Sequence, residues 1–211
     1  KGTYLRIRGI TNRADDIEFR RLVDAEIARV VATLDDRVIE GDSELAGFRT
    51  LHEQMGVSNR KNPSSPENLM RTLQRLKFLP HVNLLVDIYN LISVRTRLAL
   101  GAHDIAVIEG GATLRLTSGS EKFLPLGSTK TVPVRAGEYS YVDDANDIIC
   151  RLEVRQVEKT KITPTSNDVF YIIQGSRNTA DDLLRDATRQ LIGLTKQYCG
   201  GVEEILYSSI A

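Results

Sequence analysis

The chain has 211 residues, enough for one large domain or two small ones with a sizeable core. A hydrophobic fraction of 41% and a charged fraction of 27% exclude a disordered chain and a disulfide-dense miniprotein. Because 28 Lys and Arg residues balance 28 Asp and Glu residues, the chain has no overall attraction to nucleic acid, and any RNA contact must come from local basic patches.

The cysteines and histidines give no sign of a metal or a disulfide framework. Cys150 and Cys199 stand far apart and are expected to be buried free thiols, which favours a reducing, cytoplasmic location. His52, His81 and His103 fall on separate predicted elements, without the spacing of a zinc site. Nucleotide-binding glycine motifs are also missing, and no apolar run approaches the roughly 18 residues of a membrane span. We therefore predict no metal, no cofactor and no membrane partner.

Residues 1–100 are predicted to be mainly helical after an N-terminal strand over Tyr4–Ile10. Asp15 and Glu18 resemble a capping box, and apolar residues at helical spacing continue from there to Leu34. Three more helices are predicted, from Asp42 or Ser43 to Gly56, from Ser64 to just before Pro80, and from about Val82 to Leu98.

Residues 101–175 are predicted to be mainly β, and residues 176–211 to form a last helix and strand. The last helix is predicted to start with a Thr179 cap and to end at Gly200, before a strand over Val202–Ser208. Helices followed by strands favour an α+β fold, with sheets packed against helices in one domain over 1–211. The expected strands are Ala106–Glu109, Ala112–Leu116, Thr131–Val134, Glu138–Val142, Asp147–Arg155 and Asp168–Ile173.

A polar stripe on the fourth helix is a candidate ligand site. Asn83, Asp87 and Asn90 follow each other at i, i+4 and i+7 on a helix that is otherwise apolar. A buried carboxylate needs hydrogen-bond partners. The stripe therefore either recognises a ligand or forms an internal network that braces the helix against turns near Gly101 and Gly110.

The segment Leu100–Asp104 links the helical and β parts. Gly101 permits a close backbone approach, and peptide N–H groups near Gly101 and Gly110 could stabilise an oxyanion. His103 is a candidate general base, expected to titrate near neutral pH, with a core or capping histidine as the alternative.

Two basic clusters are candidate phosphate contacts, each with an ordinary solvated face as the alternative. The first has five basic residues and one acidic residue between residues 59 and 77, and the second has four and two between residues 151 and 161. Asp143, Asp144 and Asp147 are best explained by a hairpin turn rather than a metal site. The candidate RNA-binding residues are Arg71, Arg75, Arg151, Arg155, Lys159 and Lys161.

Several motifs in order resemble the B3/B4 domain of the phenylalanyl-tRNA synthetase β chain. They are Asn62-Pro63-Ser64-Ser65-Pro66-Glu67-Asn68-Leu69, Val86-Asp87-Ile88-Tyr89-Asn90, Leu100-Gly101-Ala102-His103-Asp104 and Ile108-Glu109-Gly110. Phe123-Leu124-Pro125-Leu126-Gly127, Gly137-Glu138 and Cys150-Arg151 fit the stand-alone form of that domain. The resemblance spans roughly 62–173 and implies a layered fold with a cleft between helices and sheet.

In the synthetase this domain hydrolyses tyrosine wrongly attached to phenylalanine tRNA. Its Leu-His-Ala-Phe-Asp stretch contributes the histidine to editing, but here Gly101 stands at the histidine position and His103 at the phenylalanine position. Its Gly-Gly-Glu glutamate corresponds to Glu158 in an ungapped alignment, with Gln156 and Val157 in place of the glycines. Set beside the resemblance, His103 and Glu158 are the candidate catalytic groups. The polar stripe and the two glycines supply the candidate substrate contacts Asn83, Asp87, Asn90, Gly101 and Gly110.

Three functions follow from the resemblance and from this departure. The first is hydrolysis of mischarged aminoacyl-tRNA, with water attacking the ester near His103 and Glu158 without a metal. The second is non-catalytic binding of tRNA, phenylalanine tRNA among the candidates, or of an amino acid. The third is a structural partnership with a synthetase. Under each of these functions, we expect that the chain cannot aminoacylate tRNA alone, because the synthetase's catalytic core does not fit in 211 residues.

Overall fold

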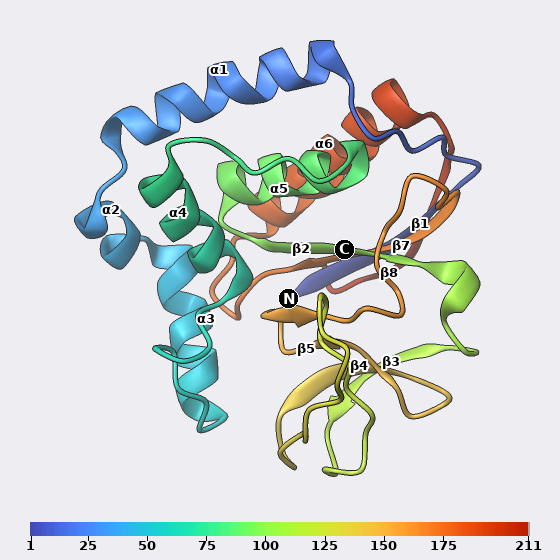
Figure 1. Ribbon diagram of the computed structural model, residues 1–211. Coiled ribbons are helices and arrows are strands. Elements are labelled where there is room, and N and C mark those ends of the chain that lie inside the picture. The colour runs from blue at the N-terminus through green and yellow to red at the C-terminus, as the bar shows by residue number, and fades with distance from the viewer. Residues whose placement is uncertain (211) are drawn as a thin grey trace.

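The computed structural model describes residues 1–210 as helices and two antiparallel sheets arranged in layers (Figure 1). One sheet has the strand order β2-β7-β1-β8, and the other has the order β3-β4-β5-β6. Helices α5 and α6 lie against the first sheet with α1 beyond them, and the second sheet lies on the opposite side (Figure 1). This arrangement confirms the α+β class.

The elements run in the following order along the chain. The first half contains β1 (Gly2–Arg8), α1 (Ile17–Thr33), α2 (Asp36–Gly41), α3 (Ser43–Gln54), α4 (Ser65–Leu76) and α5 (Leu84–Thr96). The second half contains β2 (Ala99–Asp104), the 3₁₀ turn η1 (Ile105–Val107), β3 (Ala112–Leu116), β4 (Tyr139–Asp143), β5 (Ile148–Arg151), β6 (Arg155–Gln156), β7 (Asp168–Gln174), α6 (Asp181–Cys199) and β8 (Val202–Ser208).

Strand β7 joins the two layers of core because its side chains alternate between them. Val169, Tyr171 and Ile173 belong to the large core shared with the helices. Phe170 and Ile172 belong to a second cluster with residues of β4 and β5, between the two sheets. A strand buried on both faces gives a continuous apolar run, and this strand was predicted almost to its ends.

Strand β2 was missed, and its neighbourhood was predicted wrongly. The segment expected to be a link pairs with β7 along its whole length. The strand was missed because its small and polar residues show no alternation of apolar and polar side chains, although side chains on both of its faces are buried. The predicted strand at Ala106–Glu109 is instead the turn η1, because the Asp104 carboxylate accepts a hydrogen bond from the Ala106 N–H at 3.0 Å and starts the turn.

Two helix caps differ from the predictions. Asp16, not Asp15, caps α1, accepting hydrogen bonds from the N–H groups of residues 18 and 19. Ala180 occupies the cap position of α6, while the Thr179 hydroxyl donates to Glu44 at 2.6 Å. A further helix, α2, was not predicted, and Asp35 caps it.

The β half also has two corrections. The predicted strand at Thr131–Val134 has no ladder partner and is irregular. The predicted long strand over Asp147–Arg155 is divided into β5 and β6. Leu152 between them has a φ of 51°, a left-handed conformation that ends a strand.

Candidate functional site

A cleft of about 410 Å³ lies where the helical layer meets both sheets. Residues of α4, α5, β2, β4, β5, β6 and β7 line it, so it draws on segments from residue 65 to residue 174. This volume suits a small-molecule ligand or the end of a larger one.

Gly101 and His103 share the face of β2 that lines this cleft. Gly101 pairs with Ile172 and His103 pairs with Phe170, both from the β7 face that is turned toward the second sheet. Side chains two residues apart on a strand lie on the same face. The strand that the sequence did not reveal therefore brings the histidine to the same side as the glycine.

His103 is almost completely buried, with 1% of its surface exposed. Its Nδ1 lies 2.8 Å from the Thr160 hydroxyl oxygen, whereas its Nε2 has no hydrogen-bond partner among residues 1–210. Burial lowers the pKa of the imidazole to about 4. The expected titration near neutral pH is therefore wrong, and at pH 7 the ring is a neutral imidazole.

The polar stripe on α5 divides between two roles. Asn83 is the helix cap, accepting from the Val86 N–H at 3.2 Å and donating to the Ile162 carbonyl at 3.3 Å. Asp87 accepts from the Val82 N–H at 3.1 Å and pairs with His81. Neither residue lines the cleft, but Asn90 does. Two members of the stripe thus act in an internal network, and one remains a candidate substrate contact.

Glu158 and Gly110 are not among the described residues that line the cleft. Glu158 Oε2 accepts from the Gly127 N–H at 2.9 Å, and its carboxylate pairs with Lys161. Gly110 lies in a turn against Asp144, with a φ of 66°. Glu158 and Gly110 therefore stay predictions that lie outside the lining of this cleft.

Glu153 is the carboxylate residue that lines the cleft instead. Its Oε1 lies 2.6 Å from His52 Nε2, and its Oε2 accepts a hydrogen bond from the Tyr139 hydroxyl. Burial alone would lower the pKa of His52, but the contacts with Glu153 and Asn59 outweigh it and raise that pKa. This buried pair links the end of α3 to the second sheet.

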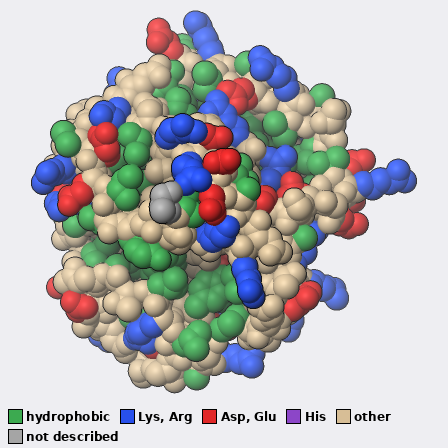
Figure 2. Space-filling model, turned by 180° about the vertical axis from the view of Figure 1, so that it is seen from behind, with side chains coloured by type: hydrophobic (Ala, Val, Ile, Leu, Met, Phe, Trp, Pro, Cys, Tyr) green, Lys and Arg blue, Asp and Glu red, His purple; other side chains and the backbone are tan. Residues whose placement is uncertain are grey.

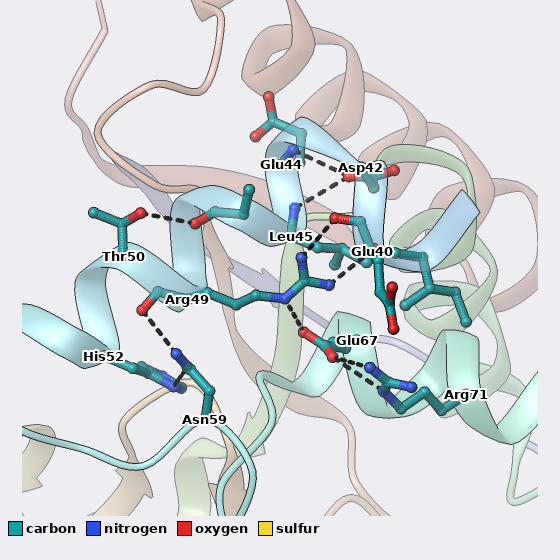
Figure 3. Close-up of polar contacts among 12 residues, drawn as sticks. Glu40, Asp42, Glu44, Leu45, Arg49, Thr50, His52, Asn59, Glu67 and Arg71 are labelled. Atoms are coloured by element: carbon teal, nitrogen blue, oxygen red, sulfur yellow. Dashed lines mark hydrogen bonds and ion pairs between the residues drawn. The ribbon is translucent and has the colours of Figure 1, made fainter. Parts of the chain in front are cut away.

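A second, smaller hollow of about 360 Å³ adjoins α3 and α4, around Glu67. Glu67 accepts from Arg49 Nε at 2.8 Å on one oxygen and from Arg71 at 2.8 and 3.0 Å on the other (Figure 3). Arg49 also donates to the carbonyls of Ile39 and Glu40. These contacts connect α2, α3 and α4.

Most of the predicted RNA-binding residues are engaged in ion pairs. Arg71 pairs with Glu67, and Lys161 with Glu158. Acidic and basic side chains are also interspersed over the face seen in Figure 2. Arg151 pairs with Glu138, and Lys159 with both Asp143 and Asp147. Of the six predicted RNA-binding residues, Arg75 and Arg155 are the two without an acidic partner among residues 1–210.

Several polar side chains that were not predicted as site residues line the cleft, and three of them come from its strands. Gln156 comes from β6, Tyr141 from β4 and Gln174 from β7. The Tyr141 hydroxyl lies 2.9 Å from Gln174 Oε1, to which it donates. The three residues come from three different strands, so no spacing in the sequence connects them. Arg155 also lines the cleft, as one predicted residue of the second basic cluster.

Within residues 1–210, no set of three or more His, Cys, Asp and Glu residues is placed to hold a metal ion. No helix of the described part of the chain has both the length and the apolar character required to cross a membrane.

Comparison with known proteins gives a consistent result. The chain is 29% identical over 167 residues to the phenylalanine–tRNA ligase beta subunit of Chromobacterium violaceum, a match covering 79% of this chain and 21% of that protein. The chain thus spans about a fifth of that relative. A crystal structure of an N-terminal fragment of the phenylalanyl-tRNA synthetase beta subunit from Pyrococcus horikoshii has the same fold, with a TM-score of 0.50 and 12% identity over 96% of this chain and 46% of that one.

The B3/4 domain family matches residues 53–200, which include α4, α5, β2 and every strand that lines the cleft. Because this match covers most of the chain, the protein belongs to the B3/4 domain family.

Proposed function

We propose that the protein binds the aminoacyl end of a tRNA in the cleft and hydrolyses the ester of a mischarged aminoacyl-tRNA. The observation that carries the proposal is His103, whose Nε2 is buried and unpartnered at the cleft face of β2. A buried nitrogen without a partner costs about 1–3 kcal/mol, a cost that a ligand or water placed beside it removes.

At neutral pH a nitrogen of the imidazole ring is available to a water molecule. Burial lowers the pKa of the ring to about 4, so the ring is uncharged and one nitrogen can accept a hydrogen bond from water, although a base of this pKa takes up a full proton only weakly. When Nδ1 carries the ring proton and donates it to Thr160, Nε2 is the acceptor on the cleft side. The arrangement therefore supports His103 as the group that activates water.

The names of the two relatives support the same class of substrate. Both are beta subunits of phenylalanine–tRNA ligase, and an aminoacyl-tRNA is a product of ligases of that kind. We therefore propose an aminoacyl-tRNA as the ligand, with phenylalanine tRNA as the first to test, and a synthetase as a candidate partner. Arg75 and Arg155 are the proposed phosphate contacts, because they lack an acidic partner among residues 1–210.

Non-catalytic binding of the same ligand is the second candidate. It is favoured by Gly101, which supplies no side chain at the floor of the cleft. It is also favoured by the ion pairs that occupy four of the six predicted RNA-binding residues.

Deacylation of a panel of aminoacyl-tRNAs, tyrosyl-tRNA charged on phenylalanine tRNA among them, separates the two candidates. For a hydrolase, we expect His103→Asn to slow deacylation about a hundredfold. His81→Asn, a histidine outside the cleft, is the matched control and should keep the rate. If deacylation of every substrate is no faster than in buffer and an amide-linked aminoacyl-adenosine still binds, the hydrolase is excluded and the binding function is the one supported.

A further inference from the structure

Two side-chain nitrogens border the bare backbone of Gly101. A Cβ atom added to Gly101 would lie 2.8 Å from Gln156 Nε2 and 4.0 Å from His103 Nε2. The amide of Gln156 thus occupies the space that a side chain at position 101 would fill. Gly101 and these two side chains all line the cleft.

The two nitrogens have complementary chemistry. The neutral imidazole of His103 can accept a proton at Nε2, whereas an amide nitrogen only donates. Gln156 Nε2 lies 3.5 Å from the Ala102 carbonyl oxygen, a long and weak contact that leaves a donor to be engaged.

We infer that Gln156 is a catalytic donor, which hydrogen-bonds the ester carbonyl oxygen while His103 activates the attacking water; this rests on the proposed function. Negative charge develops on that oxygen as water attacks, and a donor already in place stabilises it. The nearby peptide N–H groups proposed from the sequence belong to Gly101 and Gly110, but Gly110 lies outside the lining of the cleft.

The proposed step is balanced without a further reactant. The water oxygen forms a bond to the ester carbon, and the water proton passes to His103 Nε2. The bond between that carbon and the ribose oxygen then breaks, and the ribose oxygen takes the proton from the imidazolium. The products are a free amino acid and an RNA 3′-hydroxyl, and the imidazole is neutral again.

The test combines two substitutions in the full chain. Gln156→Met removes the donor at similar length, and Gly101→Ala introduces a methyl group that displaces the amide. We expect each to lower kcat for deacylation about a hundredfold with little change in KM. We expect Gly101→Ala to have little further effect once Gln156 is Met, because both act on the same donor.

Gln54→Met, on an exposed residue at the end of α3, is the matched control and should retain the wild-type rate. Thermal melting of each variant establishes that it is folded. A Gln156→Met protein that is folded and deacylates at the wild-type rate would overturn the role of Gln156 and leave the hydrolase intact. A wild-type protein without deacylation activity would overturn the hydrolase and this inference together.

Discussion

The imidazole of His103 is hydrogen-bonded to Thr160, whose hydroxyl oxygen lies 2.8 Å from Nδ1. Thr160 is itself fully buried, and its carbonyl accepts a hydrogen bond from the Asp104 N–H at 3.0 Å. The residue that fixes the ring thus also fixes the end of β2. Because one ring nitrogen is occupied in this way, the other is left for the cleft.

Thr160→Val should therefore disturb the ring without changing the shape of the core. We expect the free energy of unfolding to fall by about 1–2 kcal/mol, because Nδ1 loses its only partner among residues 1–210. Nitrogen chemical shifts of His103 should also show a mixture of tautomers instead of one. Thr50→Val, on the exposed face of α3, serves as the control. A single unchanged tautomer in Thr160→Val would contradict the positioning role.

Burial of His103 predicts a loss of stability in acid. Its pKa is about 4 in the folded protein and about 6.5 in the unfolded chain, so the unfolded chain binds more protons between these values. The free energy of unfolding should fall as the pH decreases from 6.5 to 4, by roughly 3 kcal/mol from this residue. Urea unfolding of wild type and His103→Asn across this range tests it. Parallel curves for the two proteins would show that the histidine is accessible to protons when folded.

The pair of His52 and Glu153 predicts the opposite dependence on pH. The raised pKa of His52 means that its contribution to stability is complete below about pH 6.5 and is lost as the pH rises through the folded-state value. The difference in unfolding free energy between wild type and His52→Asn should therefore shrink toward alkaline pH. A constant difference would show that the pair is not ionised.

Glu153→Ala should lower the free energy of unfolding by about 3–5 kcal/mol near pH 6, because it leaves a buried imidazolium without its partner. Chemical denaturation measures the change. Glu53→Ala, an exposed glutamate at the end of α3, is the control for loss of a carboxylate. A Glu153→Ala protein as stable as the control would contradict a buried charge pair.

Asp87, near the start of α5, contacts His81 and Val82 in the segment before the helix. Its removal should therefore destabilise the fold. We expect Asp87→Ala to lower the free energy of unfolding by about 2 kcal/mol, since the Val82 N–H and His81 both lose their acceptor. Asp87→Asn should cost less because it keeps an acceptor oxygen. Asp24→Ala, on an exposed position of α1, controls for the change of charge. A melting temperature of Asp87→Ala equal to that of wild type would show that these contacts contribute nothing.

The sequence predicted the elements whose signal is local and strong. The apolar spacing of α1, α3, α4, α5 and α6, the apolar run of β7 and the hairpin turn after β4 are each contained in one short stretch. The order of helices and strands then indicated the α+β class, and a series of short motifs indicated the family. Cys150 and Cys199 are free as predicted from their spacing, but only Cys199 is buried, whereas Cys150 is half-buried.

The cleft depends on contacts between residues that are far apart in the sequence, and these contacts leave no pattern in it. Asn83 caps its helix through a local bond from Val86, but its amide also donates to the carbonyl of Ile162, 79 residues away, a contact that only the fold creates. The engagement of the basic clusters was decided by acidic side chains from other strands, such as Asp143 opposite Lys159.

By itself, the sequence determined the long helices and the strongly apolar strand β7, because hydrophobic periodicity acts over a few residues. It also placed Gly101 and His103 two residues apart. Only the tertiary structure decided that this stretch is a strand, since β2 forms by pairing with β7 some 70 residues later. That pairing turns His103 to the side of Gly101, and the fold brings Gln156 over the glycine. The physical reason is that pairing and burial are properties of residues that meet in space, and these residues are far apart in the chain.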